Sequence, residues 1–428
     1  MNVLSKIFVL CGIGLSALLP SRGGAAVHDV RAYGAKGDGC AKDTGAIQKA
    51  IDAAASAGGG TVELGAGTYL SGSLFLKSNV DFHLCAGAVL KGSPDPTDYN
   101  AAEVCPQNAA SPKTGDNTSG GHLLLCIGQR NVIVRGPGRI DGNADAFLLD
   151  EKGERYPSKR AIPWRPAQMV WFVDSTDVRI EDVEIADSPY WSCFLLNCTR
   201  VWVRGCYVHT ERRRYHTFNG DGIDIDRCQH VSVSDCRIDT ADDCLTLRAS
   251  CASRLAKPQD CAFVTVDNCS LSSSCNVIRP GVGEGRVHDC TLSNLVMSDS
   301  NVAFNFVAAY GAGERGPDIT DVQISNVRIA GAKQFLKMHH MFSEEALFRN
   351  IVFSDVTGSV CKPSQVYAHP HRPFEDVRFR NCDLPCGVEI VNAKDVRFEG
   401  GSLTRISISD GRLQELSEAI ANHKLLLH

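Results

Sequence analysis

Two acidic clusters in the sequence contain residues that could perform acid–base chemistry. The first spans Asn219–Asp226, which includes Asp221 and Asp224, and the second is the pair Asp242 and Asp243. Asp221 precedes Asp242 by 21 residues and Asp243 by 22. Carboxylates that lie close together repel one another, so at least one should keep its proton near neutral pH. A protonated acid beside ionised carboxylates is what hydrolysis of a glycosidic bond requires.

Each cluster alone also fits ordinary turn chemistry or a loop that binds calcium. A spacing of 21 to 22 residues favours the catalytic interpretation if it equals one turn of a repeating structure. One feature opposes it, because Ile223 and Ile225 alternate with Asp224, so Asp221 would face inward with the isoleucines. We expect Gly222 to supply a kink that redirects Asp221.

A short internal repeat supplies the elements that would position these residues. Apolar residues alternate with others, around a polar pair that often contains Asp, in Val178–Ile185, Val201–Val208 and Val231–Ile238. Further copies start at Val264, Val322, Val377 and Val396, and degenerate copies start at Val132 and Val287. Successive starts lie 23 residues apart from 178 to 201 and from 264 to 287, and the step from 132 to 178 suggests two repeats. The steps of 30 and 33 suggest one repeat plus a loop.

The alternation has a period of two residues, which indicates strands. A unit of about 23 residues cannot bury its own inner face, but stacked units can. The sequence therefore predicts an all-β fold, a right-handed parallel β-helix that forms a single domain over residues 27–428. A sandwich or a propeller would need closer hairpin turns or a longer repeat.

The ends and loops of this solenoid can also be assigned. Residues 43–55 carry an apolar stripe with helical spacing and are expected to form a helix that caps the N-terminal end. Residues 413–427 show a weaker periodicity and are expected to form a C-terminal cap or tail. Residues 100–121 and 151–165 are polar and non-repetitive, so we expect two long loops on one side.

Many of the 19 cysteines follow the repeat. Cys206, Cys236, Cys269 and Cys382 stand five residues after the first valine of a repeat, and Cys198, Cys228 and Cys261 stand three before it. Equivalent positions stack about 4.8 Å apart, so these thiols should form inward ladders of free cysteines. The better candidates for disulfides are Cys40, Cys85, Cys105, Cys361 and Cys386. The sequence contains no CxxC pair or HExxH motif, so it gives no support for a structural zinc site or another metal.

Composition and the N-terminus limit the class of protein. The 428 residues are 43% hydrophobic and 22% charged, with a formal net charge of −5, which excludes a wholly disordered chain and gives no indication of a nucleic-acid partner. Residues 1–26 resemble a signal peptide cut near Ala26, because Lys6 precedes a short apolar run and small residues follow it. We expect an exported, monomeric protein outside the membrane, and the alternative is an uncleaved anchor.

Several motifs together resemble glycoside hydrolase family 28, the polygalacturonases. The opening Asp29–Gly39, the stretches Gly58–Val62 and Gly67–Gly72, and the turn Ser188–Trp191 are similar to the N-terminal and pre-catalytic segments of that family. Asn219–Asp224 resembles the family's Asn-Thr-Asp-Gly-Phe-Asp, and Asp242–Cys244 resembles its Asp-Asp-Cys. The similarity covers most of residues 28–400 and implies a pectin-lyase-like solenoid with an inverting hydrolase activity.

The resemblance also implies roles for matched residues. Asp242 would be the general acid, Asp221 and Asp243 would hold and activate the attacking water, and Asp224 would support them. Asn219 belongs to the same motif and is a candidate for substrate binding. No cofactor is implied.

Two family motifs are missing. Where the family has Gly-His-Gly, this chain has Cys275 and Asn276 without a histidine, and its Arg-x-Lys pair is replaced by the strand 302–307. We expect substitutes for substrate binding in Asn276, Arg279 and the basic run of Arg212, Arg213, Arg214 and His216. That run also fits a solvated surface loop, and Lys337–His340 is assigned to the surface or the groove wall.

Three functions remain open from the sequence. The favoured one is a secreted hydrolase of a uronic-acid-containing polysaccharide or oligosaccharide of the pectin type, acting without a metal. The second is a polysaccharide lyase on the same fold, and the third is a non-catalytic glycan-binding β-helix, which the missing motifs keep under consideration.

Overall fold

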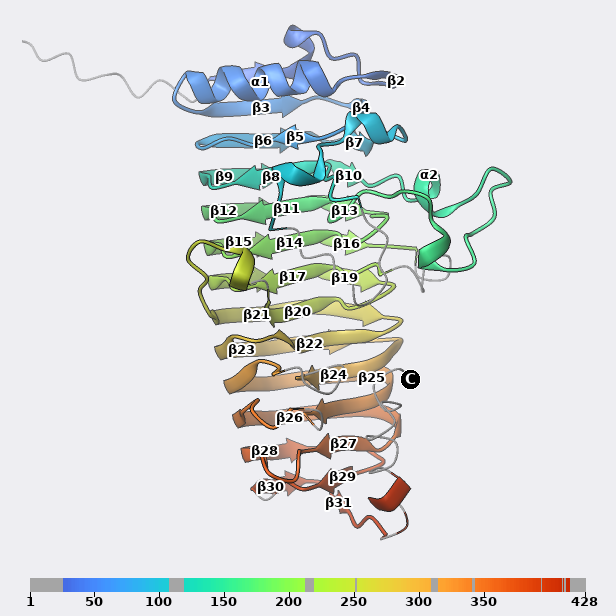
Figure 1. Cartoon of the computed structure of the whole chain (residues 1–428), viewed down its shortest axis with the longest axis vertical. Helices are drawn as coiled ribbons and strands as arrows, with labels where there is room; N and C mark the ends of the chain where they lie inside the picture. Colours follow the sequence, from blue (N-terminus) through green and yellow to red (C-terminus); the bar gives the residue numbers. More distant parts are fainter. Residues whose placement is uncertain are drawn as a thin grey trace, which may run out of the picture.

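The chain forms a tall stack of β coils (Figure 1). The computed structural model describes residues 26–107, 119–211, 219–250, 252–308, 315–340, 343–393, 395–409, 411 and 413–415. Every pairing between the described strands is parallel, and each strand pairs with its equivalents one coil before and one coil after. The right-handed parallel β-helix predicted from the repeat is therefore confirmed.

Three faces make up each coil in the first two thirds of the stack. The site face contains β5 (Leu74–Phe75), β8 (Leu124–Ile127), β11 (Val170–Val173), β14 (Cys193–Leu196), β17 (Ile223–Asp226), β20 (Leu245–Ala249), β22 (Asn276–Gly283), β24 (Ser300–Val307), β27 (Ser364–Tyr367), β29 (Val388–Val391) and β31 (Arg405–Ile406). The second face contains β1 (Val27–Asp29), β3 (Gly60–Leu64), β6 (Val80–Leu84), β9 (Arg130–Arg135), β12 (Thr176–Glu181), β15 (Thr199–Arg204), β18 (Gln229–Ser234), β28 (Glu375–Cys382) and β30 (Val396–Gly401).

The third face is built from short strands and then from long ones that bend around the coil. Its short strands are β2 (Asp38–Lys42), β4 (Gly67–Ser71), β7 (Ala88–Gly92), β10 (Arg139–Asp141), β13 (Glu184–Ala186), β16 (Tyr207–His209) and β19 (Arg237–Thr240). Long strands that cover more than one face follow: β21 (Cys261–Ser273), β23 (Arg286–Met297), β25 (Asp318–His339) and β26 (Phe348–Lys362). Outside the sheet lie α2 (Asp145–Leu148) and the 3-10 turns η1 (Val30–Tyr33), η2 (Pro96–Asp98), η3 (Ala102–Val104), η5 (Lys159–Ala161) and η6 (Ala252–Arg254).

The repeat defines the register of the coils, with two corrections. Val178, Val201, Val231 and Val264 pair in successive coils, so the steps of 30 and 33 residues are single coils with a loop, as predicted. Val132 pairs directly with Val178, so that step is one coil with a long insertion, although two were expected. Val287 pairs with Cys261 and Cys290 pairs with Val264, so Cys290 is the equivalent of the first valine and the expected repeat start at Val287 is three residues too early.

The polar pair inside each repeat forms the bend between the second and third faces. One residue of each bend adopts a left-handed backbone, with φ of 54° at Asp182, 56° at Asp235, 52° at Asn268 and 55° at Asn294. Asn and Asp tolerate this conformation better than other non-glycine residues. Their side chains also bond from coil to coil, as where Asn268 Nδ2 donates to Asp235 Oδ1 at 2.7 Å.

The N-terminal end is capped by α1 (Thr44–Ser56), as the apolar stripe predicts. The helix lies across the first coil (Figure 1), and Ile47, Ala50, Ile51 and Ala54 are buried beneath it. This cap covers apolar side chains of the first coil that would otherwise face water. At the other end, most of residues 413–427 lie outside the described part of the chain, as do residues 1–25, which contain the predicted signal peptide.

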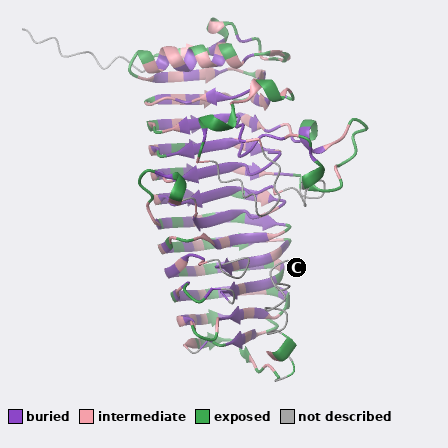
Figure 2. Cartoon of the chain, viewed as in Figure 1, coloured by how far each residue is buried: buried purple, intermediate pink, exposed green. Residues whose placement is uncertain are grey.

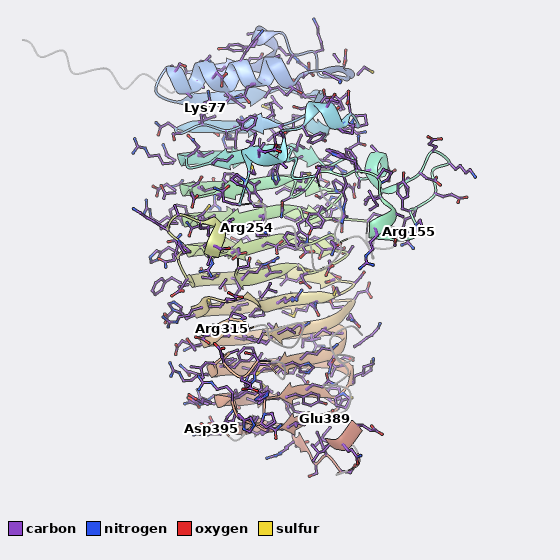
Figure 3. The ribbon with its side chains drawn as sticks, viewed as in Figure 1. Lys77, Arg155, Arg254, Arg315, Glu389 and Asp395 are labelled. Atoms are coloured by element: carbon purple, nitrogen blue, oxygen red, sulfur yellow. The ribbon has the colours of Figure 1, made fainter. Side chains whose placement is uncertain are left out.

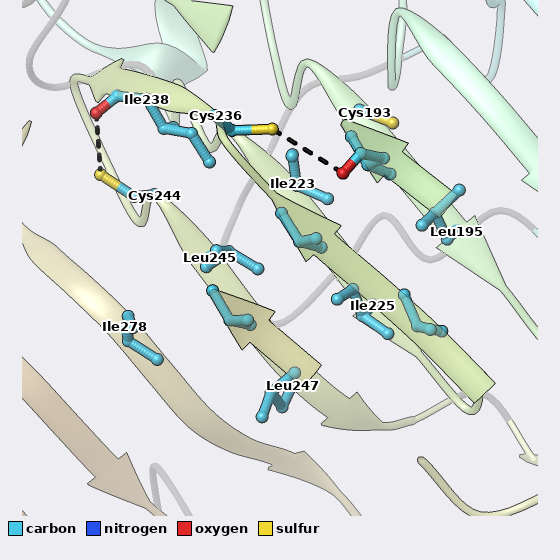
Figure 4. Close-up of a cluster of buried hydrophobic side chains, with 14 of the residues drawn as sticks. Cys193, Leu195, Ile223, Ile225, Cys236, Ile238, Cys244, Leu245, Leu247 and Ile278 are labelled. Carbon is cyan, nitrogen blue, oxygen red and sulfur yellow. Dashed lines mark hydrogen bonds between the residues drawn. The ribbon is translucent and has the colours of Figure 1, made fainter. Parts of the chain in front are cut away.

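The predicted cysteine ladders line the core. Cys198, Cys228 and Cys261 occupy adjacent coils and are fully buried, and the Cys198 backbone N–H donates to Cys228 Sγ at 3.3 Å. Figure 4 shows Cys193, Cys236 and Cys244 among the inward leucines and isoleucines. The disulfide candidates are corrected: Cys40, Cys85, Cys105, Cys361 and Cys386 are all free thiols.

Burial alternates along strands such as β3, β6 and β7, whereas β11, β14, β17 and β20 on the site face are buried at every residue (Figure 2). The charged side chains of Lys77 and Glu389 lie at opposite ends of the stack (Figure 3). None of the helices in the described ranges is long and apolar enough to cross a membrane.

Candidate functional site

The first acidic cluster lies on the turn from β16 into β17. Asn219 starts this turn with a left-handed backbone, φ 63°, whereas Gly222 has no such angle. The prediction of a kink at Gly222 is therefore wrong, because the left-handed residue of this turn is Asn219. Glycine is required at position 222 for a different reason, the close approach of the next coil. A Cβ there would lie 2.5 Å from the Cys244 carbonyl oxygen and 2.7 Å from Ile238 Cγ2, so only glycine lets the two coils approach this closely.

The second cluster lies on the equivalent turn one coil further along, from β19 into β20. The Gly222 backbone N–H donates to the Asp243 carbonyl at 2.8 Å, which fixes Asp221 and Asp243 in adjacent coils. The Ser273 and Thr240 hydroxyls donate to the Asp242 carbonyl at 2.5 and 2.8 Å. The sequence spacing of one coil is thereby confirmed, and the structure brings the two clusters together.

Asp243 is buried and fully partnered. Its Oδ2 accepts from Arg279 Nη1 at 2.9 Å, and its Oδ1 accepts from Asn276 Nδ2 at 2.7 Å. Asn276 is in turn held by Asn305 Nδ2 at 2.9 Å. Arg279 and Asn276, both predicted as substrate-binding residues, thus hold Asp243, which suits a carboxylate that must accept a proton from water.

Asp224 lies beside this group on β17, where the sequence places it. Its Oδ1 accepts from the Thr246 hydroxyl at 2.5 Å and from Arg248 Nη1 at 3.2 Å, while its buried Oδ2 has no hydrogen-bond partner among the residues that the structure describes. Arg248 stands 4.6 Å from the centroid of the Trp191 ring, and Trp191 stacks on Phe194. Sequence analysis did not single out Arg248, although its place two residues after Thr246 on the catalytic strand was available as a signal.

Burial and mutual repulsion raise the pKa values in this cluster. The pKa of Asp221 lies well above its ordinary value because of burial and the charges of Asp242, Asp224 and Asp243. Burial raises the pKa of Asp224 to about 6, against the lowering effects of Arg248 and Thr246. These directions agree with the expectation that one carboxyl keeps its proton near neutrality, and Asp221 is the residue they point to, since a group with a pKa of about 6, as in Asp224, is mostly ionised at pH 7. Asp242 is partly exposed at the surface of the site.

A cleft of about 610 Å³ runs beside Asp242 along the edge of the third face. The Thr210 hydroxyl, which lines the cleft, accepts from the Ala241 N–H at 2.9 Å, and the lining Ser273 contacts the Asp242 backbone. Four acidic residues line it as well, Asp187, Glu211, Asp239 and Asp299. This wall is predominantly acidic next to the most exposed of the catalytic candidates.

A basic row lies on the other side of the aspartates, on the site face. Arg279 on β22, Asn305 on β24 and Lys337 on β25 occupy equivalent positions in consecutive coils. Lys337 was assigned to the surface or groove wall, and it is half-buried in this row; burial lowers its pKa. The neighbouring His339 and His340 are buried instead, with His339 stacked on Tyr367, which corrects their assignment.

Of the remaining predicted substrate-binding residues, the structure describes Asn219 and leaves four outside its described ranges. Asn219 lies at the start of the catalytic turn with a buried, unpartnered Oδ1. Arg212, Arg213, Arg214 and His216 lie outside the described residues, so their role stays a prediction.

Two groups of described residues bring three metal-ligating atoms within 4.8 Å of one another: Asp242, Asp243 and Cys275, and separately Glu63, His83 and Cys85. The first group suits calcium poorly, because calcium prefers six to eight oxygen ligands, whereas this group includes a thiol and adjoins Arg279.

Fold and site together define a parallel β-helix with a centre of clustered carboxylates. Residues 113–402 match the sequence profile of Glycosyl hydrolases family 28, and residues 27–186 match Rhamnogalacturonase A/epimerase, pectate lyase-like. The chain belongs to glycosyl hydrolase family 28.

Individual relatives agree with this assignment. An exo-poly-α-D-galacturonosidase of Dickeya chrysanthemi is 25% identical over 334 residues, which cover 68% of this chain and 54% of that protein. A probable polygalacturonase of Vitis vinifera is 26% identical over 51% of this chain and 43% of its own length. The chain thus spans about half the length of the curated relatives it matches. The exopolygalacturonase of Thermotoga maritima has a similar fold, with TM-score 0.64 and 18% identity over 89% of this chain and 90% of that one.

Proposed function

We propose that this protein is a glycoside hydrolase that cleaves a pectin-type, uronic-acid-containing polysaccharide. The observation that carries the proposal is the meeting of Asp221, Asp242 and Asp243 on adjacent coils beside a cleft. Membership of family 28 and similarity to a galacturonosidase support it. They favour hydrolysis over a lyase reaction and over a binding function.

In the proposed mechanism, Asp242 protonates the leaving oxygen, since it is the most exposed carboxyl of the cluster and its backbone carbonyl accepts a hydrogen bond from Ser273, which lines the cleft. Asp243, held by Arg279 and Asn276, accepts a proton from the attacking water, and Asp221 helps to hold that water. Asp224 and Arg248 support Asp221 electrostatically. The raised pKa of Asp221 supplies the cluster with a proton near neutral pH.

We propose inversion at the anomeric carbon, as the family resemblance implies. Oxygens of Asp242 and Asp243 lie within 4.8 Å of each other, closer than the about 6.5–9.5 Å common between inverting carboxyls. Asp221 supplies a third carboxylate, so the water can be held between Asp221 and Asp243, away from the line that joins the close pair. Proton NMR of the first product tests this step: the inverted anomer is expected, and the retained anomer would refute it.

The charges around the site suggest a substrate of mixed character. Arg279 and Lys337 in the basic row suit the carboxylate of a uronate. The cleft suits a neutral sugar better than a second uronate, because its lining, in the part of the chain that the structure describes, stays net acidic: it has four carboxylates against one lysine, Lys333, and Arg139 pairs with one of the four, Asp187. We therefore propose a decorated or mixed-backbone pectin as substrate, with plain homogalacturonan a poor one.

The test uses purified protein with homogalacturonan, rhamnogalacturonan and their oligosaccharides, with and without a chelator. New reducing ends should appear without the ultraviolet absorbance of an unsaturated uronate, and chelation should not matter. Absorbing products would refute the hydrolase in favour of a lyase, and no products from any glycan would favour a binding function.

Variants link the activity to the site. Asp221→Asn, Asp242→Asn and Asp243→Asn should each lower kcat by at least about a hundredfold, the scale of a lost acid or base. Asp235→Asn is the matched control, because Asp235 lies on the same coil as Asp242 but is exposed on another bend. Near-normal rates in all three variants would show that the carboxylate assignment is wrong.

We also propose that residues 1–26 are a signal peptide and that the mature domain starts at Val27. N-terminal sequencing of the exported protein should begin near Val27, and retention of the segment would favour an anchor.

A further inference from the structure

A mixed cluster of ligand-type side chains lies far from the catalytic aspartates, on the first coils of the second face. Glu63 on β3 and His83 on β6 are direct neighbours in register, and Cys85 follows two residues after His83. These coils lie beside the capping helix at the N-terminal end of the stack (Figure 1). Cys85 was a disulfide candidate, and in the structure it is a free thiol next to an imidazole and a carboxylate.

One of the separations between the three ligand atoms already matches a shared ion, and the other atoms lie close enough for small side-chain movements to bring them into range. His83 Nδ1 lies 3.5 Å from Glu63 Oε2 and 3.9 Å from Cys85 Sγ, and all three atoms lie within 4.8 Å of one another. A tetrahedral zinc ion, with bonds of about 2.0–2.3 Å, holds neighbouring ligand atoms about 3.3–3.6 Å apart. A strong direct hydrogen bond between nitrogen and oxygen would be shorter, about 2.7–3.2 Å.

The backbone holds the cluster in place before any ion binds. Cys85 N–H donates to the Leu64 carbonyl at 3.0 Å, and the Cys85 carbonyl accepts from the Ala88 N–H at 2.9 Å. The side chains of His83 and Glu63 are 17% and 37% exposed, so an ion can enter from solvent and a water can complete its coordination. Ligands fixed in this way lose little conformational freedom when the ion binds.

Neighbouring charges permit a cation. Asp29 pairs in register with Glu63 on one side and adds negative charge. Arg135 pairs in register with His83 on the other side, but its guanidinium is bound to Asp81, with Nε–Oδ1 at 2.8 Å and Nη2–Oδ2 at 3.0 Å. The positive charge of Arg135, which is the nearest one in register, is thus neutralised by the carboxylate of Asp81.

We propose that Glu63, His83 and Cys85 form a site for a zinc-class divalent metal ion, with a water as the fourth ligand. The combination of thiolate, imidazole and carboxylate is typical of Zn²⁺ and its substitute Co²⁺, and not of Ca²⁺ or Mg²⁺. The ion joins β3 to β6 and so links two adjacent coils beneath the cap. Because the site forms only when these coils are folded, the bound ion stabilises the native state.

The test is metal binding by the full-length protein after removal of metal with a chelator. Co²⁺ should bind in one equivalent and produce a thiolate-to-cobalt absorption band, and Zn²⁺ should displace it and raise the Tm. Cys85→Ser should abolish the band, His83→Gln should lower the affinity at least tenfold, and Glu63→Gln should weaken it. The metal-free variants should unfold like the metal-free parent, which separates a binding defect from a folding defect.

Two controls make the result decisive. Cys40→Ser and Cys361→Ser remove exposed free thiols and should leave the band unchanged. Cys275→Ser tests the other group of ligand atoms, beside Asp242 and Asp243. A band that survives Cys85→Ser but disappears with Cys275→Ser would overturn the proposal, as would the absence of any thiolate band or a disulfide that includes Cys85.

Discussion

Asp224 offers a quantitative test of how burial acts on the acidic cluster. It is fully buried, and burial raises its pKa from an ordinary 3.8 to about 6 even though Arg248 and Thr246 lower it. Between these two pH values the native protein keeps a proton that the unfolded chain releases. Ionisation therefore favours unfolding, and the free energy of unfolding falls as the pH rises from 3.8 to about 6.

The magnitude follows from the shift. About two pKa units at about 1.4 kcal/mol each correspond to about 3 kcal/mol. Asp224→Asn removes this titration. The cost of weaker bonds to Thr246 and Arg248 is nearly independent of pH, so it cancels when variant and parent are compared across pH. The variant also removes a charge that raises the pKa of Asp221, and this effect acts in the same direction. Relative to the parent, the variant should gain about 3 kcal/mol between pH 4 and pH 7.

The measurement is urea unfolding of both proteins at a series of pH values, followed by tryptophan fluorescence. Asp177→Asn is the control of opposite sign, because hydrogen bonds from exposed Arg200 lower the pKa of Asp177. Stability from that pair is present above the unfolded pKa and is lost as the pH falls, so the control variant should lose slightly relative to the parent as the pH rises. A variant-minus-parent difference for Asp224→Asn that is flat, or that declines with pH, would refute the reasoning.

Three further predictions concern packing, thiols and substrate charge. Gly222→Ala should lower the free energy of unfolding by about 1–3 kcal/mol, since the new Cβ would lie 2.5 Å from a carbonyl oxygen. Gly45→Ala in α1 should raise the free energy of unfolding by about 0.5–1 kcal/mol, because a Cβ there meets no described atom within 4 Å outside its chain neighbours and its own helix backbone. Urea unfolding measures both changes. Alkylation of the denatured, unreduced protein and peptide mapping should find the ladder cysteines Cys198 and Cys228 free, and pairing between them would contradict the ladder. Lys337→Met should raise KM for uronate oligosaccharides at least about tenfold with little change in kcat, while Lys49→Met, at an exposed position on the capping helix α1, should not; an unchanged KM would remove Lys337 from the site.

Only the tertiary structure shows which side chains contact Asp243 and which residues lie next to Arg279. Arg279 and Asn276 were candidates for substrate contact, and the fold turns both toward Asp243, because β22 stacks on β20 with Asn276 beside Asp243. Lys337 joins Arg279 from two coils away, although 58 residues separate them in the chain. In a solenoid, the neighbours of a side chain are the residues one coil away. Because loops of variable length change the number of residues per coil, the sequence alone does not show which residues these are.

The sequence by itself determined the architecture and the core of the acidic cluster. Alternation with a period of two, repeated about once per coil, fixes which side chains face inward, since a shift of one residue would expose every valine of the row. The same period placed Asp221 opposite Asp243, and the apolar stripe of 43–55 predicted the cap. The structure alone decided the register after Val264, where Cys290 replaces Val287, and the free state of the five disulfide candidates. It also decided the meeting of Glu63, His83 and Cys85. These features depend on how far each loop lengthens a coil, and that length is set by three-dimensional packing and not by any local pattern of residues.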